Sequence, residues 1–348
     1  MRFDDAAEID GDTRLRVALG ALSGAERTIY AVSGHEGVVC HRHTTLETYL
    51  ETLYATGWRR GQHRDKTTLT AVFQRYILPL VRLFDRFCID SPFLAIDTDN
   101  RVPALAPALC KSRSVGAPGL CVLHDLDRHR HFGLVADVAA ADRPFAEKSD
   151  TLVWRGATTG VFDPDRGPLS PRAFIPALAD RGRADIDVGF HTFTRRVLRD
   201  AGADGAAALE RHHRPEMDLS QQLHHRYLLS LEGHDVASGL KWMMASNSVV
   251  LMPPVTAESW ACETRLAPYR HFVPVRADLA DVPDQLSWCR REREACQAIV
   301  AAANQFVADL MHPPTNHKVG KAIVEHYAAT VALTRAPGCR IPESVLPA

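Results

Sequence analysis

Two segments in the first third of the chain repeat apolar residues at the spacing of an amphipathic helix. One covers residues 45–57 and the other residues 67–87. In the second, apolar side chains recur at steps of three and four at Leu69, Val72, Phe73, Tyr76, Ile77, Leu80, Leu83 and Phe84. This spacing puts them on one broad face, which we expect to lie in the core. Short apolar runs at residues 93–96 and 120–123 predict buried strands beside these helices, and another apolar run covers residues 28–32.

The second half of the chain alternates more regularly between short apolar runs and helical patterns. The apolar runs cover residues 151–154, 227–231, 249–252 and 271–275. Fully apolar runs of this length, separated by helices, predict a parallel sheet that is covered on both faces. Ligands of such sheets bind at the carboxyl ends of the strands. We therefore expect the chemistry in the residues that follow each run.

The organisation predicted from these patterns is two α/β domains and a C-terminal segment. A polar stretch at residues 139–149, with Pro144 and little periodicity, predicts the boundary. The domains then cover residues 1–145 and 146–312. Residues 313–348 form a helix and a Pro-rich tail, which we expect to pack back on the first domain. Further helices are predicted over residues 285–311 and 318–334, and another is expected to start at Thr256 as its N-cap.

Composition limits the classes of function. With 348 residues, 46% hydrophobic, the chain is long enough for two cores. Its 41 basic and 42 acidic residues leave a formal net charge of −1, so no global field attracts nucleic acid and any anion must be held by a local cluster. The eight cysteines form no C-x-x-C pair, and the 17 histidines show no His-Glu-x-x-His spacing. We expect neither a disulfide framework nor a metal site.

The sequence also favours a cytoplasmic protein. Its first five residues are polar and acidic, unlike a signal peptide, and no window approaches the roughly 20 apolar residues that span a bilayer. Any membrane contact is expected to be peripheral, on the cytoplasmic face of the inner membrane. The basic groups near Trp58, Arg59 and Arg60 would suit contact with an anionic membrane face or with an anionic acceptor.

Residues 154–160, which follow the first strand of the second half, have the composition of a diphosphate site. Arg155 offers a planar, permanently charged fork for phosphate oxygens. Gly156 permits close approach of the backbone, and Thr158 adds a hydroxyl donor. The alternative is a strand-to-helix turn with one surface arginine.

A second constellation follows the strand at residues 227–231. Glu232 and Asp235 offer acceptors for ribose or sugar hydroxyls, and Gly233 allows a tight turn. Ser238 lies near the start of the next predicted helix. About a turn and a half into that helix, Lys241 has the reach to bring an ammonium to a diphosphate, although a solvated lysine on a helix surface is the common alternative.

Residues 227–250 resemble glycosyltransferase family 90. This family includes eukaryotic protein O-glucosyltransferases, fungal capsule-associated (CAP10-like) xylosyltransferases and bacterial lipopolysaccharide-modifying enzymes, and the bacterial branch is the most similar. Further motifs in the same order support the resemblance between residues 93 and 306: Lys111-Ser112-Arg113, Arg130-His131-Phe132, Trp154-Arg155-Gly156, Glu258-Ser259-Trp260 and residues 271–275.

The resemblance implies a GT-B fold, in which two Rossmann-like domains with parallel sheets face each other across a cleft. The second domain would hold the nucleotide-sugar, and the first would supply the acceptor site and an aspartate as catalytic base. Asp97 or Asp99 occupies the expected place, with Asp97 narrowly favoured. An inverting reaction needs this carboxylate to take the proton of the acceptor hydroxyl.

The resemblance also extends the donor site to other charged residues. Lys111 and Arg113 match a bacterial motif and would face either the diphosphate or an anionic acceptor. Glu258 and Glu263 would bind ribose or sugar hydroxyls, or are ordinary carboxylates on a helix surface.

The activity implied is transfer of glucose or xylose from a UDP-sugar to a lipopolysaccharide core or another surface glycan, without a metal or other cofactor. The alternative is a non-catalytic protein of the same fold that binds a glycan or a nucleotide.

Overall fold

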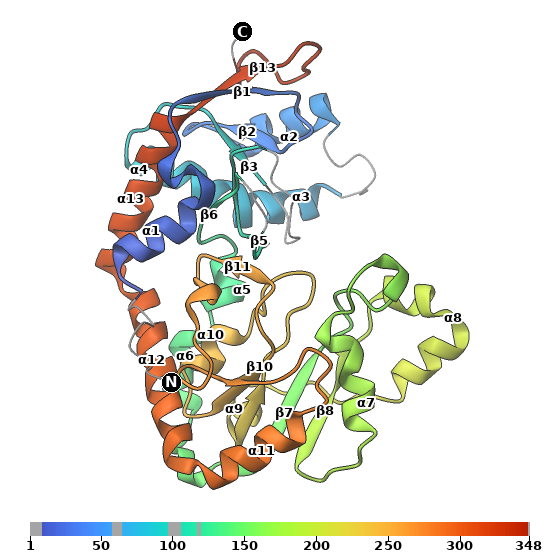
Figure 1. Ribbon diagram of the computed structural model, residues 1–348. Helices are drawn as coiled ribbons and strands as arrows, with labels where there is room; N and C mark the ends of the chain where they lie inside the picture. The colour runs from blue at the N-terminus through green and yellow to red at the C-terminus, as the bar shows by residue number, and fades with distance from the viewer. Residues whose placement is uncertain (1–8, 58–64, 97–105, 117–119, 347–348) are drawn as a thin grey trace. The chain divides into compact units, whose positions relative to one another are not determined.

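The computed structural model describes residues 9–57, 65–96, 106–116 and 120–346, which form two compact units (Figure 1). The five-stranded unit contains residues 129–256 and 263–310. The four-stranded unit contains the described part of residues 9–128, residues 257–262 and residues 311–346. The chain therefore passes between the units several times.

The five-stranded unit is built on a parallel sheet. Its strands lie in the order β12-β10-β9-β7-β8, and every neighbouring pair is parallel. Their bounds are Val273–Pro274 (β12), Val249–Met252 (β10), His225–Leu229 (β9), Ser149–Ala157 (β7) and Ile186–Thr192 (β8). The predicted parallel α/β sheet is confirmed.

Both faces of this sheet are buried, as the apolar runs predicted. Leu152 and Trp154 of β7 point to a core shared with α7, α11 and α12, whereas Val153 between them points to a core shared with α6, α9 and α10. The alternation follows from the two-residue period of a strand. The helices of the unit are Arg128–Phe132 (α5), Val135–Ala141 (α6), Ile175–Ala179 (α7), Arg195–Glu210 (α8), Leu219–Leu223 (α9), Leu240–Met244 (α10), Val282–Arg291 (α11) and Arg293–Met311 (α12).

The four-stranded unit has a mixed sheet of order β2-β3-β4-β6, in which only the pair β2 and β3 is antiparallel. Two small sheets complete it, parallel β1-β13 and antiparallel β5-β11. Its strands are Thr28–Val32 (β1), Val38–Cys40 (β2), Phe93–Ala95 (β3), Ala108–Cys110 (β4), Ser112–Ser114 (β5), Val122–Leu123 (β6), Ala257–Ser259 (β11) and Val331–Arg335 (β13). Its helices are Gly11–Leu19 (α1), Leu46–Thr56 (α2), Lys66–Val72 (α3), Leu78–Arg86 (α4) and Pro313–Thr330 (α13), with a π-helical turn Phe73–Ile77 between α3 and α4.

Three predicted helices differ in the structure. The helix over residues 318–334 ends at Thr330, because residues 331–335 pair with β1 as β13. The helix over residues 285–311 is two helices that break at Glu292. No helix starts at Thr256, because residues 257–259 form β11 instead. At residues 331–335 and 257–259, pairing with a distant strand overrides the helical pattern. At Glu292, a local break divides the helix.

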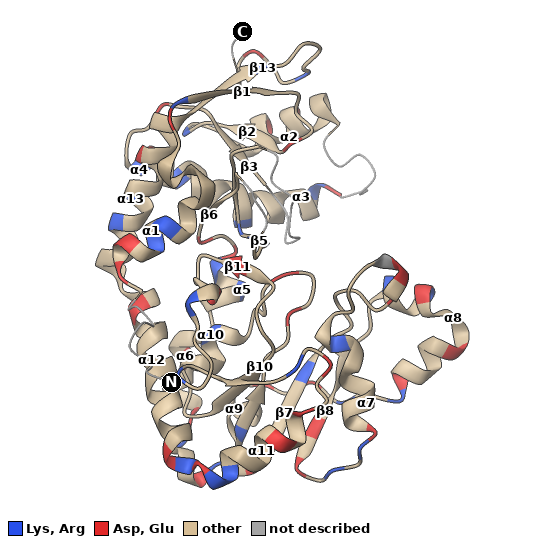
Figure 2. Ribbon diagram, viewed as in Figure 1, with Lys and Arg blue, Asp and Glu red and all other residues tan. Residues whose placement is uncertain are grey.

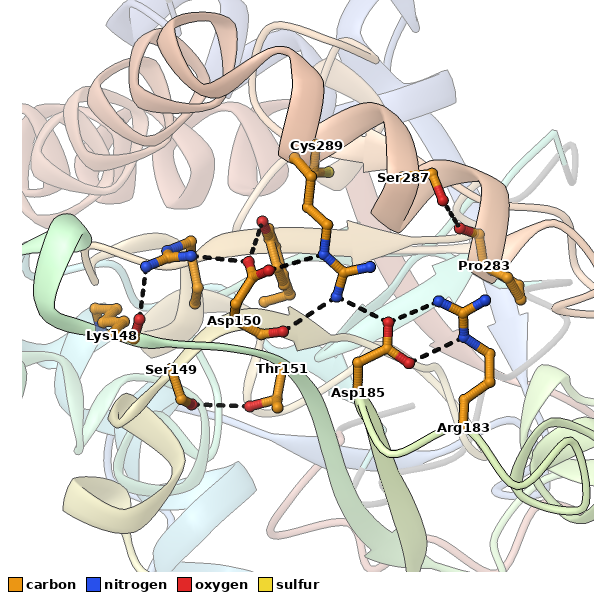
Figure 3. Close-up of polar contacts among 12 residues, drawn as sticks. Lys148, Ser149, Asp150, Thr151, Arg183, Asp185, Pro283, Ser287 and Cys289 are labelled. Carbon is orange, nitrogen blue, oxygen red and sulfur yellow. Dashed lines mark hydrogen bonds and ion pairs between the residues drawn. The ribbon is translucent and has the colours of Figure 1, made fainter.

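A network of ion pairs fastens the amino ends of β7 and β8 (Figure 3). The carboxylate of Asp150 accepts from Arg226 Nη1 at 2.8 Å, from the Tyr227 hydroxyl at 2.9 Å and from Arg290 Nε at 2.8 Å. Arg290 also pairs with Asp185 at 2.8 Å. Arg290 lies on α11, so this network connects three strands to a covering helix. It lies at the edge of the sheet opposite to the carboxyl ends of the strands.

Candidate active site

The carboxyl ends of β7, β9 and β10 meet at one edge of the five-stranded sheet because these strands are neighbours and parallel (Figure 1). Three loops leave this edge, at residues 158–160, 230–239 and 253–256. A parallel sheet binds ligands at this edge. Most of the sequence-predicted donor residues lie here: Thr158, Glu232, Gly233, Asp235 and Ser238, with Lys241 and Glu263 close by.

Arg172 joins the first two loops and was not predicted as a site residue. Its Nη1 donates to the Ala157 carbonyl at 3.0 Å and to Thr159 Oγ1 at 2.6 Å, and its Nη2 donates to the Leu231 carbonyl at 2.9 Å. Its guanidinium also lies over the ring of Trp154, 5.6 Å from the centroid. The fork of Arg172 therefore sets the geometry of the carboxyl ends of β7 and β9.

Burial and one neighbouring cation destabilise the charge of Arg172. Burial and the nearby Arg130 lower the pKa of Arg172 to about 10, while Asp235 and Glu232 act in the opposite direction. Arg172 remains charged at neutral pH, because that value is well above 7. An anion bound beside the Arg172 guanidinium would stabilise its charge. The local signal for Arg172 is Ser170, whose hydroxyl accepts from the Arg172 backbone N–H at 3.4 Å and starts a short helix.

The first two loops approach each other so closely that Gly233 is required. A Cβ added to Gly233 would lie 2.3 Å from Thr159 Oγ1. Gly160 has a φ of +106°, a conformation that favours glycine, and its own Cβ would meet Ser170 at 2.6 Å. Glycine at these two positions therefore makes room for the side chains of Thr159 and Ser170.

The acidic residues of the second loop hold it in place. The carboxylate of Glu232 accepts from the Thr256 backbone N–H at 3.0 Å and from the Thr256 hydroxyl. Asp235 is buried. Thr256 thus binds a carboxylate across the edge of the sheet instead of capping a helix. The predicted contacts of Glu232 and Asp235 with sugar hydroxyls stay predictions.

Lys241 and Glu263 form a buried pair. The Lys241 ammonium lies 3.4 Å from Glu263 Oε1, and the two residues are only 2% and 1% exposed. The ammonium also lies 5.6 Å from the centroid of the Phe132 ring. Lys241 is the second residue of α10, so the expected position a turn and a half into the helix is wrong. It is also not a solvated surface lysine. Ser238 is half-buried in the turn before α10.

Arg155, the predicted phosphate ligand, lies within β7 and bonds to protein groups. Its Nη2 pairs with Asp187 at 2.7 Å, its Nη1 donates to the Asp187 carbonyl at 3.0 Å, and its Nε donates to the Pro215 carbonyl at 3.0 Å. Its side chain is 5% exposed. The alternative of a surface arginine therefore does not describe it either. Its guanidinium connects β7 to β8.

Gly156 and Thr158, the neighbours of Arg155, also make contacts within the protein. A Cβ at Gly156 would meet the ring of Trp154 at 2.4 Å, so glycine makes room for that ring. Thr158 is fully buried, and its hydroxyl accepts from the Thr194 backbone N–H at 2.8 Å. A role of these residues in donor binding stays a prediction.

Lys111, Arg113 and Glu258 lie in the four-stranded unit. Arg113 Nη2 pairs with Glu258 Oε2 at 3.0 Å across the strands β5 and β11, and Arg113 Nη1 donates to the Cys121 carbonyl at 2.9 Å. Glu258 is therefore a strand residue, and the expectation of a carboxylate on a helix surface is wrong for it. Lys111 is buried at the carboxyl end of β4.

The two candidate bases, Asp97 and Asp99, lie outside the described residues, as do Trp58, Arg59 and Arg60.

Within the described residues, no three His, Cys, Asp or Glu side chains gather as a metal site requires. No helix in the described part of the chain is long and apolar enough to cross a membrane. On α11 the acidic Asp284 lies in the first turn and the basic Arg290 and Arg291 lie in the last turn (Figure 2).

Comparison with known proteins places this chain in a class. Residues 134–330 match the model of glycosyl transferase family 90, which is more than half of the chain. The chain is 34% identical over 255 residues to O-glucosyltransferase LpsA of Dichelobacter nodosus, covering 72% of this chain and 71% of that protein.

More distant relatives match smaller parts. Protein O-glucosyltransferase 1 of Rattus norvegicus is 23% identical over 173 residues, 49% of this chain and 39% of that protein. Uncharacterized protein 027R of Frog virus 3 is 29% identical over 181 residues, 47% of this chain and 18% of that protein. The parallel α/β sheet and these matches define a glycosyltransferase. The chain belongs to glycosyltransferase family 90, which confirms the resemblance seen in the sequence.

Proposed function

We propose that this glycosyltransferase moves a sugar, glucose or xylose, from a UDP-sugar to a lipopolysaccharide core or another surface glycan, with inversion and without a metal. The two domains of the proposed GT-B fold would face each other across the cleft in which transfer takes place. The protein would act in the cytoplasm, or peripherally on the cytoplasmic face of the inner membrane.

The observation that carries the proposal is Arg172 at the carboxyl edge of β7 and β9, where the charge of Arg130 also acts on it. Burial and the charge of Arg130 destabilise the charge of Arg172, so a bound diphosphate would stabilise it. Without a metal, such cations must stabilise the charge that develops on the leaving diphosphate. The pair Lys241 and Glu263 lies in the same unit, and its ammonium would add to this field.

The second loop, residues 230–239, would hold the sugar part of the donor through its acidic residues. Glu232 lines a small pocket at this edge together with Ser230 and Glu263. Carboxylates and hydroxyls accept and donate hydrogen bonds as ribose and hexose hydroxyls require. Asp97 or Asp99 would take the proton of the acceptor hydroxyl as that oxygen attacks the anomeric carbon.

Calorimetry with UDP tests the donor site. We expect wild-type protein to bind UDP, and Arg172→Gln to bind it about 10–150-fold more weakly, the equivalent of one charged hydrogen bond of about 1.5–3 kcal/mol. Arg155→Gln is the matched control, because the same change falls on an arginine that bonds to Asp187. A loss of affinity in the Arg155 variant alone would move the diphosphate site to the position that the sequence predicted.

Turnover tests the base. Purified protein is incubated with UDP-glucose or UDP-xylose and a lipid-linked acceptor extract, and released UDP is measured. We expect Asp97→Asn with Asp99→Asn to abolish transfer while the affinity for UDP stays nearly intact. Transfer that persists in the double variant refutes the assignment of the base. Binding of UDP or glycan without turnover under any of these conditions would favour the non-catalytic alternative.

A further inference from the structure

The four-stranded unit contains a pocket of about 290 Å³ that is not part of the donor site. It lies where the segment after β6 meets α4, α13 and the segment after β11. Its walls include His124, Asp125, Phe87, Trp260 and His317. None of these residues was assigned a role above.

His124 lines this pocket with an unsatisfied side chain. The residue is 8% exposed, and neither ring nitrogen has a hydrogen-bond partner among the described residues. Its backbone, in contrast, is satisfied, because its N–H donates to the Cys110 carbonyl at 3.0 Å and its carbonyl accepts from the Leu126 N–H at 2.8 Å. Burial lowers the pKa of His124, so the ring is neutral and has one donor and one acceptor to offer. A buried polar side chain without partners is costly, and so it points to a ligand or to water.

Asp125, the next residue, has an unsatisfied oxygen at the same pocket. Its Oδ2 pairs with Arg128, whereas the buried Oδ1 has no partner among the described residues. A carboxylate oxygen can only accept. The ligand at this position must therefore bring a donor.

Aromatic side chains fix the walls around these polar atoms. The His124 ring stacks on Trp260 with 5.3 Å between the centroids, and the Arg14 guanidinium lies 4.9 Å from the Trp260 centroid. Phe87 meets His317 edge to face at 5.2 Å. The pocket is thus lined by rings that present apolar edges beside unsatisfied polar atoms. Carbohydrates have the same mixture of C–H and O–H surface.

The chemistry of these atoms selects among ligands. Arg86 and Arg128 also line the pocket, but a carboxylate or a fully ionised phosphate offers acceptors only and would leave Asp125 Oδ1 without a donor. An acyl chain satisfies neither residue. A sugar hydroxyl can donate to Asp125 Oδ1 and also donate to or accept from His124. We propose that this pocket binds one monosaccharide unit of the glycan acceptor, a site separate from the donor edge; as an acceptor subsite, it rests on the proposed function.

Saturation-transfer NMR with glucose, galactose, mannose, N-acetylglucosamine and their disaccharides tests the pocket directly. We expect at least one of these sugars to bind, and the affinity to fall at least 10-fold in His124→Phe and in Asp125→Asn. Asp85→Asn, an exposed carboxylate on α4 that does not line the pocket, is the matched control and keeps wild-type affinity. Should His124→Phe fail to fold, the imidazole signals of His124 in the wild-type protein are followed during sugar titration and are expected to shift.

The outcomes separate this proposal from the proposed function. Absence of binding for every sugar, or equal binding by wild type and the pocket variants, overturns the subsite and leaves water as the occupant of the pocket. UDP affinity of the wild-type protein is measured in parallel. A protein that binds sugar through His124 but neither binds nor releases UDP would keep the pocket as a glycan site and refute the transferase proposal.

Discussion

The buried pair Lys241 and Glu263 allows one prediction to be worked out in detail. The two groups are 2% and 1% exposed and 3.4 Å apart, so removal of either partner leaves a charge that water cannot reach. Breaking a buried ion pair from one side costs about 3–5 kcal/mol. Lys241→Met removes the ammonium beside the buried Glu263 carboxylate, and Glu263→Gln leaves the ammonium with a neutral amide. We expect each single variant to be destabilised by an amount in this range, with the larger loss for Lys241→Met.

The double variant gives the sharper result. When both charges are removed together, no uncompensated charge remains, so the loss should be clearly smaller than the sum of the two single losses. Thermal unfolding measures this, since 3–5 kcal/mol lowers the Tm of a unit of this size by about 6–20 °C. Calorimetry with UDP tests whether Lys241, besides stabilising the fold, also contributes to UDP binding. Lys241→Met should bind UDP at least 10-fold more weakly, and more weakly than Glu263→Gln, which keeps the cation.

Two results would refute this reasoning. Single losses below about 1 kcal/mol would mean that the pair is solvated, in the range of surface ion pairs. Strictly additive losses in the double variant would mean that the two groups do not stabilise each other. Unchanged UDP affinity in Lys241→Met, with the expected loss of stability, would make the pair purely structural and leave the diphosphate to Arg172 and Arg130.

Three further changes have defined outcomes. Gly233→Ala places a Cβ 2.3 Å from Thr159 Oγ1 and should cost about 1–3 kcal/mol in urea unfolding, whereas Gly24→Ala, with open space around it, should cost less than about 1 kcal/mol. Burial and a neighbouring arginine lower the pKa of His271 to about 4, so the folded state holds a neutral ring. Stability should therefore be constant above pH 6.5 and fall by about 1–3 kcal/mol as the pH drops from 6.5 to 4, and His271→Gln should flatten this dependence in thermal melts. Asp150→Asn weakens the three bonds that its carboxylate accepts and should cost about 1–3 kcal/mol in the same assay, and an unchanged midpoint would show that the network is solvated.

Elements fixed by their own residues were predictable from the sequence. The helix predicted over residues 45–57 is α2, because Thr45 caps its first turn and Gly57 ends it with a φ of +70°. The strand predicted at residues 249–252 is β10 without change. In both, the signal lies within the segment itself.

Elements fixed by distant partners were not predictable. Thr256 and the acidic residues after it have the local pattern of a helix start, yet β11 forms because it pairs with β5, more than 140 residues earlier. The different positions of Arg155 and Arg172 also depend on contacts with distant parts of the chain. Both are arginines near the end of β7, and only the fold shows that the first bonds to β8 and the second to the carbonyl that follows β9. Local pattern cannot carry this information.

The pairing of β1 with β13 determines the order in which the two units can fold during synthesis. Residues 28–32 leave the ribosome about 300 residues before their partners at 331–335. In the same way, β5 is synthesised before β11, the strand with which it pairs. Residues 129–256 and 263–310 can assemble their sheet before that moment. The part of the chain made first is thus the part completed last, and its exposed strand edges must stay soluble until translation is nearly finished.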